Sequence, residues 1–294
     1  MVSALSVVRG RLSRELFAFV AGQDGEAARH RIHGTPGPRW FAPDTPIRRV
    51  HGDTSMYVGG LRALLLQALH PLAMAAVADH SGYQGDPWGR LSRTSTFIAE
   101  TTFGTVADAE RAVTRVRTVH GHISGVAPDG RPYRADDPHL LTWVHVAEVD
   151  SFLRAHQRYG RAPLTGAEED TYVAQAAKVA RLLGAAEVPT TRAELDDCIE
   201  GFRPELAGTP AAREVARFLL LDAPLSLRAR IPYAFVSAAA VGLLPGWARQ
   251  PLRLPHLPVT ERTVVPFAGR CVVGGLRWVV NAQPVPTADE GARA

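Results

Sequence analysis

Residues 59–82, GGLRALLLQALHPLAMAAVADHSG, decide the fold class of this 294-residue chain. The stretch is dense in alanine and leucine, the apolar residues that favour α-helices most. Pro71 lies near its middle, and because proline lacks the backbone N–H and clashes with the preceding turn, we expect a kink or a break there. In the most apolar part, residues 61–77, an arginine, a glutamine and a histidine interrupt the run. We therefore predict buried core helices here and not a membrane span.

Helical spacing continues downstream of this stretch. Residues 90–103 form the next expected helix, and Gly104 is a suitable residue to end it. A further helix starts near Asp108, and an apolar stripe with steps of three and four residues runs along it. The stripe consists of Val113, Val116, His120 and Ile123. His120 is therefore expected to point inward.

A second histidine is expected to point inward from the helix that opens at Pro138. One face of that helix carries Leu141, His145, Glu148 or Val149, and Phe152. The segment before this helix contains turn-forming residues, including Asp129 and Gly130, which predict a loop or a short hairpin. Two inward histidines on consecutive helices are unusual.

The rest of the chain is organised as one helical domain with two flanking segments. Three later segments begin near a threonine or proline start signal and keep helical spacing: residues 166–183, 191–202 and 210–221. Further on, four prolines are expected to break regular structure: Pro251, Pro255, Pro258 and Pro266. The tail after residue 281 is expected to be poorly ordered. We predict an all-α protein with an N-terminal helix and loop (residues 1–37), a helical domain (38–250) and an irregular C-terminal extension (251–294).

The composition excludes several classes of function. Hydrophobic residues make up 46% and charged residues 21%, as in ordinary globular proteins, so a packed, enzyme-like body is expected. The net charge of +4 comes from scattered arginines without basic runs, which argues against nucleic acid as a partner. Cys198 and Cys271 are too few for a disulfide framework and lack the spacing of a zinc site, which favours a reducing, cytoplasmic location.

Neither a signal peptide nor a stable membrane span is predicted. Arginines interrupt the apolar residues of the N-terminal stretch, residues 1–22, which we interpret as an amphipathic helix. The apolar residues 231–244 are too few to cross a bilayer, which takes about 20 residues.

Three segments, in this order and spacing, carry a resemblance to a known family. They are LLLQALHPLAMAAVADHSGYQGDPWGRLSRT (residues 64–94), FGTVADAERAVTRVRTVHGHISG (103–125) and DPHLLTWVHVAEVDSF (137–152). The pattern resembles the oxygenase family that includes bacterial latex-clearing protein, a rubber oxygenase, and the MpaB-like, farnesyl-cleaving oxygenase of mycophenolic acid biosynthesis. The resemblance covers roughly residues 38–250, and the order of three segments makes it more specific than a single motif.

The resemblance implies a globin-like, all-helical core around haem b, one axial histidine, and oxidative cleavage of isoprenoid double bonds. In such proteins an arginine precedes the axial histidine by a few residues. Arg117 and His120 match that pattern, so the resemblance implies His120 as the iron ligand and Arg117 in the cofactor-binding segment. The upstream helix of these relatives carries distal arginine and threonine groups, and Arg90, Arg93 and Thr94 lie in the similar stretch. These groups would polarise bound oxygen or stabilise a developing oxyanion, or one arginine would pair with a haem propionate.

The other histidines have several interpretations. Haem iron needs a neutral imidazole nitrogen held in a pocket lined by apolar helices, and His120 on its apolar stripe meets the first requirement. His145 could be a second axial ligand, a distal proton donor or a packed residue near the pocket, with Trp143 as part of an aromatic wall. His70 is more typical of a residue that stabilises a helix turn, and so is the adjacent pair Asp79 and His80.

Non-haem metal chemistry is a further alternative, because the chain also offers His122, Glu148 and Asp150. A carboxylate-bridged di-iron bundle requires Glu-x-x-His on two helices, and no such tandem pair occurs here. A mononuclear iron site with two histidines and a carboxylate is only slightly better supported. The segment before Cys271 resembles a haem-thiolate loop only superficially, and we expect Cys271 to be a small buried hydrophobe.

The sequence therefore predicts a haem b-dependent oxygenase that acts with O₂ on a hydrophobic substrate, either isoprenoid, terpenoid or aromatic. The alternative is a cofactor-free helical binding protein that keeps the family fold. Glycine-rich nucleotide-binding motifs and the G-x-S-x-G elbow of hydrolases do not occur.

Overall fold

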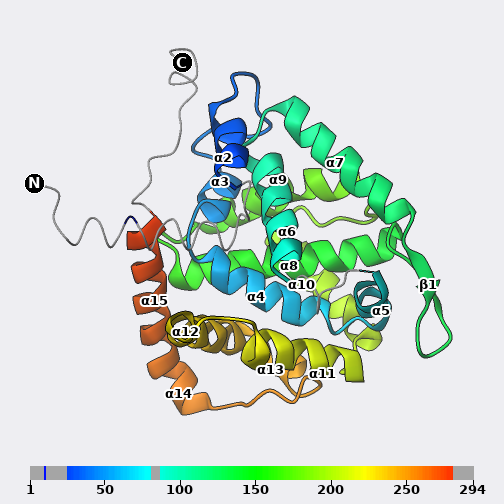
Figure 1. Cartoon of the computed structure of the whole chain (residues 1–294), viewed down its shortest axis with the longest axis vertical. Helices are drawn as coiled ribbons and strands as arrows, with labels where there is room; N and C mark the ends of the chain where they lie inside the picture. The colour runs from blue at the N-terminus through cyan, green and yellow to red at the C-terminus, as the bar shows by residue number, and fades with distance from the viewer. Residues whose placement is uncertain (1–9, 11–24, 81–86, 281–294) are drawn as a thin grey trace, which may run out of the picture.

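A computed structural model describes residues 10, 25–80 and 87–280 of the chain, and their regular structure is helical apart from one short hairpin, which confirms the all-α prediction (Figure 1). The expected N-terminal helix and the tail after residue 281 lie outside the described residues. The α-helices are α2 (Gly25–Gly34), α3 (Pro46–His51), α4 (Met56–Gln67), α5 (Pro71–His80), α6 (Pro87–Phe103), α7 (Val106–Gly121), α8 (Pro138–Tyr159), α9 (Gly166–Leu183), α10 (Arg192–Phe202), α11 (Pro210–Arg217), α12 (Leu227–Leu243), α13 (Gly246–Arg249), α14 (Pro258–Arg262) and α15 (Val264–Val280). A 3₁₀ turn, η1 (Arg203–Glu205), follows α10, and a π-helical turn, η2 (Phe218–Asp222), follows α11.

The apolar stretch of residues 59–82 contributes to α4 and α5, with a bend of 105° between them. Pro71 is the first residue of α5, so the predicted break occurs there and the missing N–H of proline costs no helical hydrogen bond. Across the described part of the chain, we find no single helix with the length and apolar character needed to cross a membrane. Only the bent α4–α5 pair reaches that length and apolar character together.

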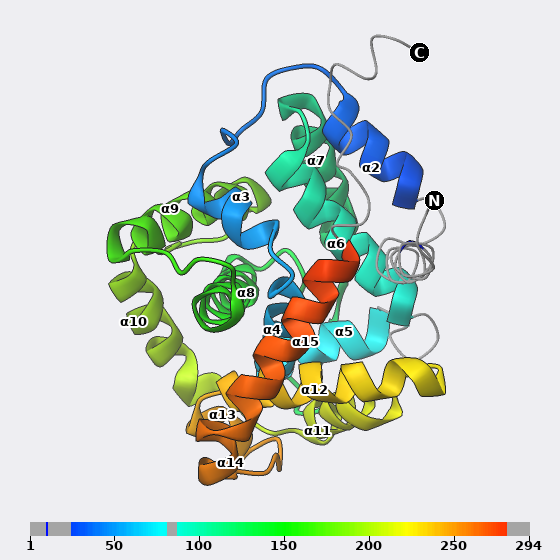
Figure 2. The ribbon, with the colours of Figure 1, turned by 90° about the vertical axis from the view of Figure 1, so that its left-hand side faces the viewer.

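Helix α8 lies at the centre of the fold, as Figure 2 shows in a view along its axis. It begins at Pro138 as predicted, and the Asp137 side chain caps it by accepting hydrogen bonds from the next free amides, at 2.8 and 3.1 Å. The helix packs against α4 most extensively and also against α3, α9, α10 and α15. A crossing this close requires a residue without a side chain on α4. A Cβ atom on Gly59 would lie 3.1 Å from the Ser151 carbonyl oxygen of α8.

The hairpin predicted before α8 is also present. Strands β1 (Ser124–Val126) and β2 (Pro132–Arg134) pair in antiparallel register, and Gly130 in the turn has the positive φ of 85° that glycine favours. The Tyr133 hydroxyl bonds to the Asp79 carboxylate at 2.6 Å and to the His80 ring at 3.1 Å. Asp79 and His80 therefore hold the hairpin against the end of α5.

The prediction of irregular structure beyond residue 250 is wrong for residues 258–280, which form α14 and α15. Pro258 is the first residue of α14 and Pro266 the third residue of α15, and amides in a first turn have no acceptor within the helix. These prolines are therefore compatible with helix starts. Helix α15 packs against α12, and the expectation that Cys271 is buried is also wrong, because it lies on the exposed side of α15.

Candidate active site

Two of the helices that pack on α8, α3 and α9, belong to a closed circuit of four. Helix α3 contacts α6 and α9, and α7 also contacts α6 and α9, so these four form a closed circuit that we call the frame. The face of α8 that was predicted to carry Leu141, His145, Glu148 and Phe152 turns toward the frame. Leu141 lies beside the end of α9, where a Cβ on Gly184 would be 3.8 Å from its Cδ1 atom, and the Phe152 ring centroid is 5.5 Å from that of His51 on α3.

A partly buried hydrogen-bond chain crosses the frame. The His51 Nδ1 atom lies 2.8 Å from the Thr102 hydroxyl of α6, and its Nε2 atom lies 3.4 Å from the Tyr172 hydroxyl of α9. Burial lowers the pKa of His51 to about 3, so the ring is neutral at pH 7. Burial, followed by the negative charges of Glu148 and Asp150, raises the pKa of Tyr172 well above its ordinary value. The chain therefore joins three helices of the frame through uncharged groups.

Two titratable side chains of α8 face this enclosed region. Burial, with a smaller contribution from Arg181, lowers the pKa of His145 to about 4. Burial raises the pKa of Glu148 to about 7. The Nε2 atom of His145 is buried and has no hydrogen-bond partner among the described residues, which is rare for a buried polar atom. His145 and Glu148 are nevertheless only half-buried as whole residues, although they belong to the central helix.

His120 lies in the last turn of α7 and is half-buried. Burial lowers the pKa of His120, against an opposing effect of Asp136, so its ring is neutral at pH 7. Its ring makes no hydrogen bond with the described part of the chain. The neighbouring His122 differs, because it is exposed and its Nδ1 atom lies 2.6 Å from the Thr118 carbonyl oxygen.

Comparison with known proteins adds one finding. A family model described as ER-bound oxygenase mpaB/B'/rubber oxygenase, catalytic domain, matches residues 48–280. The chain belongs to this family. It is thus an oxygenase, an enzyme that acts with O₂ on a small-molecule substrate. Searches of curated proteins and of solved structures gave no match.

The oxygenase domain includes α6, α7, α9 and α15 whole, and α3 from its third residue onward. Arg90, Arg93 and Thr94 lie in the first two turns of α6, and His120 lies in the last turn of α7. Because a short turn joins these two packed helices, the start of α6 and the end of α7 are the two ends that lie away from that turn (Figure 1). Arg90 is half-buried, and burial followed by the charge of Arg93 lowers its pKa, whereas Arg93 and Thr94 are exposed. Arg117 donates from Nη1 to the Leu182 carbonyl oxygen at 3.2 Å, which ties the end of α7 to α9.

Two of the sequence candidates lie away from this region. Trp143 is fully buried on another face of α8, where its ring centroid is 5.2 Å from that of Phe202, so the structure does not bring it together with His145. The Asp150 carboxylate is already paired with three arginines: Arg62 at 2.8 Å, Arg154 at 2.7 Å and Arg192 at 3.2 Å. Burial alone would raise the pKa of Asp150, but these charges hold it below its ordinary value. Its oxygens are thus engaged in structural ion pairs.

Sequence reasoning missed His51, Thr102 and Tyr172. They come from three helices separated by 51 and 70 positions, so no local spacing connects them. His51 is the last residue of the six-residue helix α3, which is too short for a periodic pattern to stand out. The sequence predicted one face of α8, and these residues lie on helices beside that face, but nothing in the sequence connected them with it.

Proposed function

We propose that the protein is a haem b-dependent oxygenase in which the imidazole of His120 holds the iron and the frame encloses a hydrophobic substrate. The family match supports oxygenase chemistry. The observation that carries the haem assignment is the state of His120: a half-buried ring, neutral at pH 7, whose nitrogens have no hydrogen-bond partner among the described residues. A haem ligand must be a neutral imidazole with a free nitrogen lone pair.

The residues within the frame fit such a group. A buried and unpartnered Nε2 atom on His145 is costly in a finished core, and it is expected where a bound molecule completes the site. His145, Glu148 and His51 are surrounded closely enough for burial to dominate their pKa values, yet each stays half-buried rather than fully buried. Side chains that line an enclosed space combine these two properties. When bound, haem iron supplies the O₂ chemistry that amino acid side chains lack.

The side chains of this chain would then bind, orient and exchange protons. The carboxyl group of Glu148 has a pKa of about 7 and can take up or release a proton near neutral pH, as a general acid or base does. The neutral ring of His145 offers Nε2 to a polar atom of the bound molecule. Arg90, Arg93 and Thr94, at the end of α6 that lies away from the turn to α7, would stabilise negative charge that develops on oxygen.

The surroundings support a hydrophobic substrate. On α8, Leu141 and Phe152 flank the polar pair His145 and Glu148, and both are buried. On α7, Val113 is buried on the stripe that leads to His120. Apolar walls with few polar groups favour a hydrophobic small molecule and exclude water from the reacting atoms. We therefore expect an isoprenoid, terpenoid or aromatic substrate.

A pyridine haemochrome assay together with iron analysis of the purified protein tests this proposal. Stoichiometric haem and iron are expected. Iron without porphyrin absorption would indicate a non-haem iron centre in place of haem. A folded protein that contains no haem and takes none up on reconstitution would refute the proposal and leave a binding protein with the family fold.

A further inference from the structure

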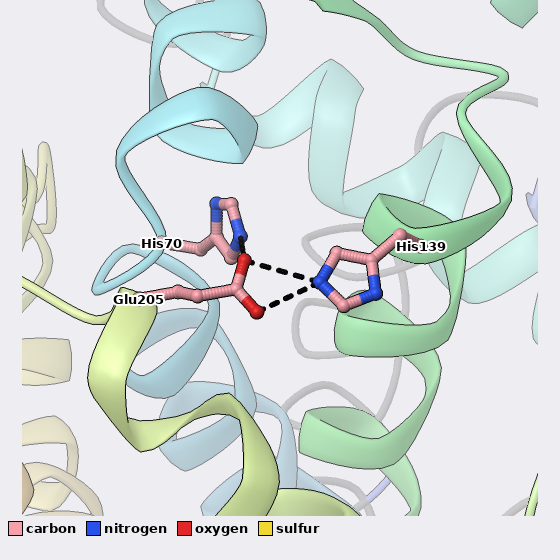
Figure 3. A group of neighbouring side chains, drawn as sticks. All are labelled: His70, His139 and Glu205. Atoms are coloured by element: carbon pink, nitrogen blue, oxygen red, sulfur yellow. Dashed lines mark hydrogen bonds and ion pairs between the residues drawn. The ribbon is translucent and has the colours of Figure 1, made fainter.

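Three side chains outside the frame point toward one another, as Figure 3 shows, and two of them, His139 and Glu205, are exposed. His70 lies in the turn between α4 and α5, His139 in the first turn of α8, and Glu205 at the end of η1. The His139 Nε2 atom lies 2.8 and 3.0 Å from the two carboxylate oxygens of Glu205, and the His70 Nε2 atom lies 3.4 Å from one of them. One ligand atom from each residue can be chosen so that all three lie within 4.8 Å of one another.

We propose that His70, His139 and Glu205 form a site for a divalent cation such as Zn²⁺, Co²⁺ or Fe²⁺. Two imidazole nitrogens and one carboxylate oxygen are a donor set that suits these borderline metals. Ligand atoms about 2.0–2.2 Å from such an ion are roughly 3.0–3.5 Å from each other. The separations from both histidines to Glu205 fall near this range, so an ion would need mainly to draw the two imidazoles closer together.

The surroundings give this group one fixed ligand and two adjustable ones. The His70 side chain is 1% exposed, and its ring packs beside the rings of Trp143 and Phe202, with centroids 6.3 Å from each. The His139 ring packs against the Phe202 ring, with centroids 4.5 Å apart. The side chains of His139 and Glu205 are 57% and 38% exposed, so they can adjust to an ion at little cost.

The charge at this cluster also favours a cation. Glu205 is the acidic member of the three side chains, so a cation would supply a counter-charge to its carboxylate. Arg131 is a positive charge further away that opposes a cation here, but its guanidinium is already bound to the Asp129 carboxylate at 2.8 and 2.9 Å. Three protein ligands with an exposed side would leave the remaining positions of the ion to water or to a small ligand.

This site is separate from the region inside the frame. His70 lies against Trp143, which points from another face of α8 than His145 does. The proposal therefore does not depend on haem binding, and the two can fail independently.

Titration of the full-length, chelator-treated protein with Zn²⁺ alone, followed by calorimetry, tests the site, and Co²⁺ provides a visible absorption spectrum for the ligand set. We expect one tight site in the wild type and a loss of affinity of more than about 100-fold in His139→Ala and Glu205→Gln, because losing even an outer partner of a ligand costs roughly 10–100-fold. His122→Ala, which removes an exposed histidine elsewhere, should bind as the wild type does.

The result that would overturn the proposal is equal affinity in the wild type and in either ligand variant, or no binding by the wild type. Circular dichroism melts of each variant show whether it is folded. Glu205→Gln keeps the size of the side chain, so it stays informative if His139→Ala disturbs the start of α8. Both ligand variants should retain the haem content of the wild type.

Discussion

Replacement of Asp150 by asparagine is expected to destabilise the protein by about 3–5 kcal/mol, the usual cost of removing one partner of a buried ion pair. Asp150 and Arg62 are both buried, and their charged atoms are 2.8 Å apart. Arg62 also donates to the Ser151 hydroxyl at 2.7 Å and to the Leu243 carbonyl oxygen at 3.0 Å, which fixes it between α4, α8 and α12. Asparagine keeps the volume and removes the charge, so the guanidinium of Arg62 stays buried without a counter-charge.

Thermal and urea unfolding followed by circular dichroism measure this effect. At roughly 2–4 °C per kcal/mol, Tm should fall by on the order of 6–20 °C. Asp196→Asn is a matched control, because Asp196 pairs with the same Arg154 and Arg192, at 3.1 and 2.6 Å, but at the surface. Its cost should be at most about 1 kcal/mol. Equal effects of the two substitutions would refute the claim that burial of the Arg62–Asp150 pair sets its importance.

Three further substitutions test other parts of the structure. Gly59→Ala should cost about 1–3 kcal/mol in unfolding free energy, because its Cβ would meet α8 backbone. Gly60→Ala is the control and should be neutral or stabilising, because the nearest atom to its Cβ is 4.0 Å away. Equal effects of the two substitutions would contradict the close crossing of α4 and α8. The pKa of Glu148 is raised from 4.5 to about 7, so the folded state binds this proton more tightly than the unfolded state does. The free energy of unfolding of the wild type should therefore fall by up to about 3 kcal/mol as pH rises through this window. Glu148→Gln should abolish that loss in urea titrations from pH 4.5 to 8, and a wild-type profile without it would contradict the assignment. The pKa of His145 is lowered from 6.5 to about 4, so stability should instead fall as pH drops through that window, and His145→Gln should reduce this fall; an unchanged pH profile would show that the ring is not buried as described.

Local spacing explains which elements could be predicted from the sequence. The α4–α5 break follows from one proline within an apolar run, and the start of α8 follows from Pro138. The prediction failed at α15, because the four prolines after residue 250 were all expected to break regular structure, whatever their position in a helix. Pro266 lies in a first turn, where a helix tolerates it.

The candidate site was predictable only in part, for a related reason. The spacing of His145 and Glu148 on α8 placed both on one face, because this relation lies within a single helix. The contact of His51 with Tyr172 depends on how α3 and α9 pack, and the approach of Glu205 to His139 depends on where η1 ends. Such contacts depend on tertiary packing between residues 66 or more positions apart, which the sequence pattern does not encode.

The absorption spectrum of His120→Ala beside that of His122→Ala tests the central claim most directly. The two histidines are two positions apart at the end of α7, and the structure distinguishes them, because His122 bonds to its own helix whereas His120 has no partner among the described residues. We predict a Soret band in the wild type and in His122→Ala and its loss in a folded His120→Ala. An unchanged Soret band in His120→Ala would contradict the assignment of His120 as the iron ligand.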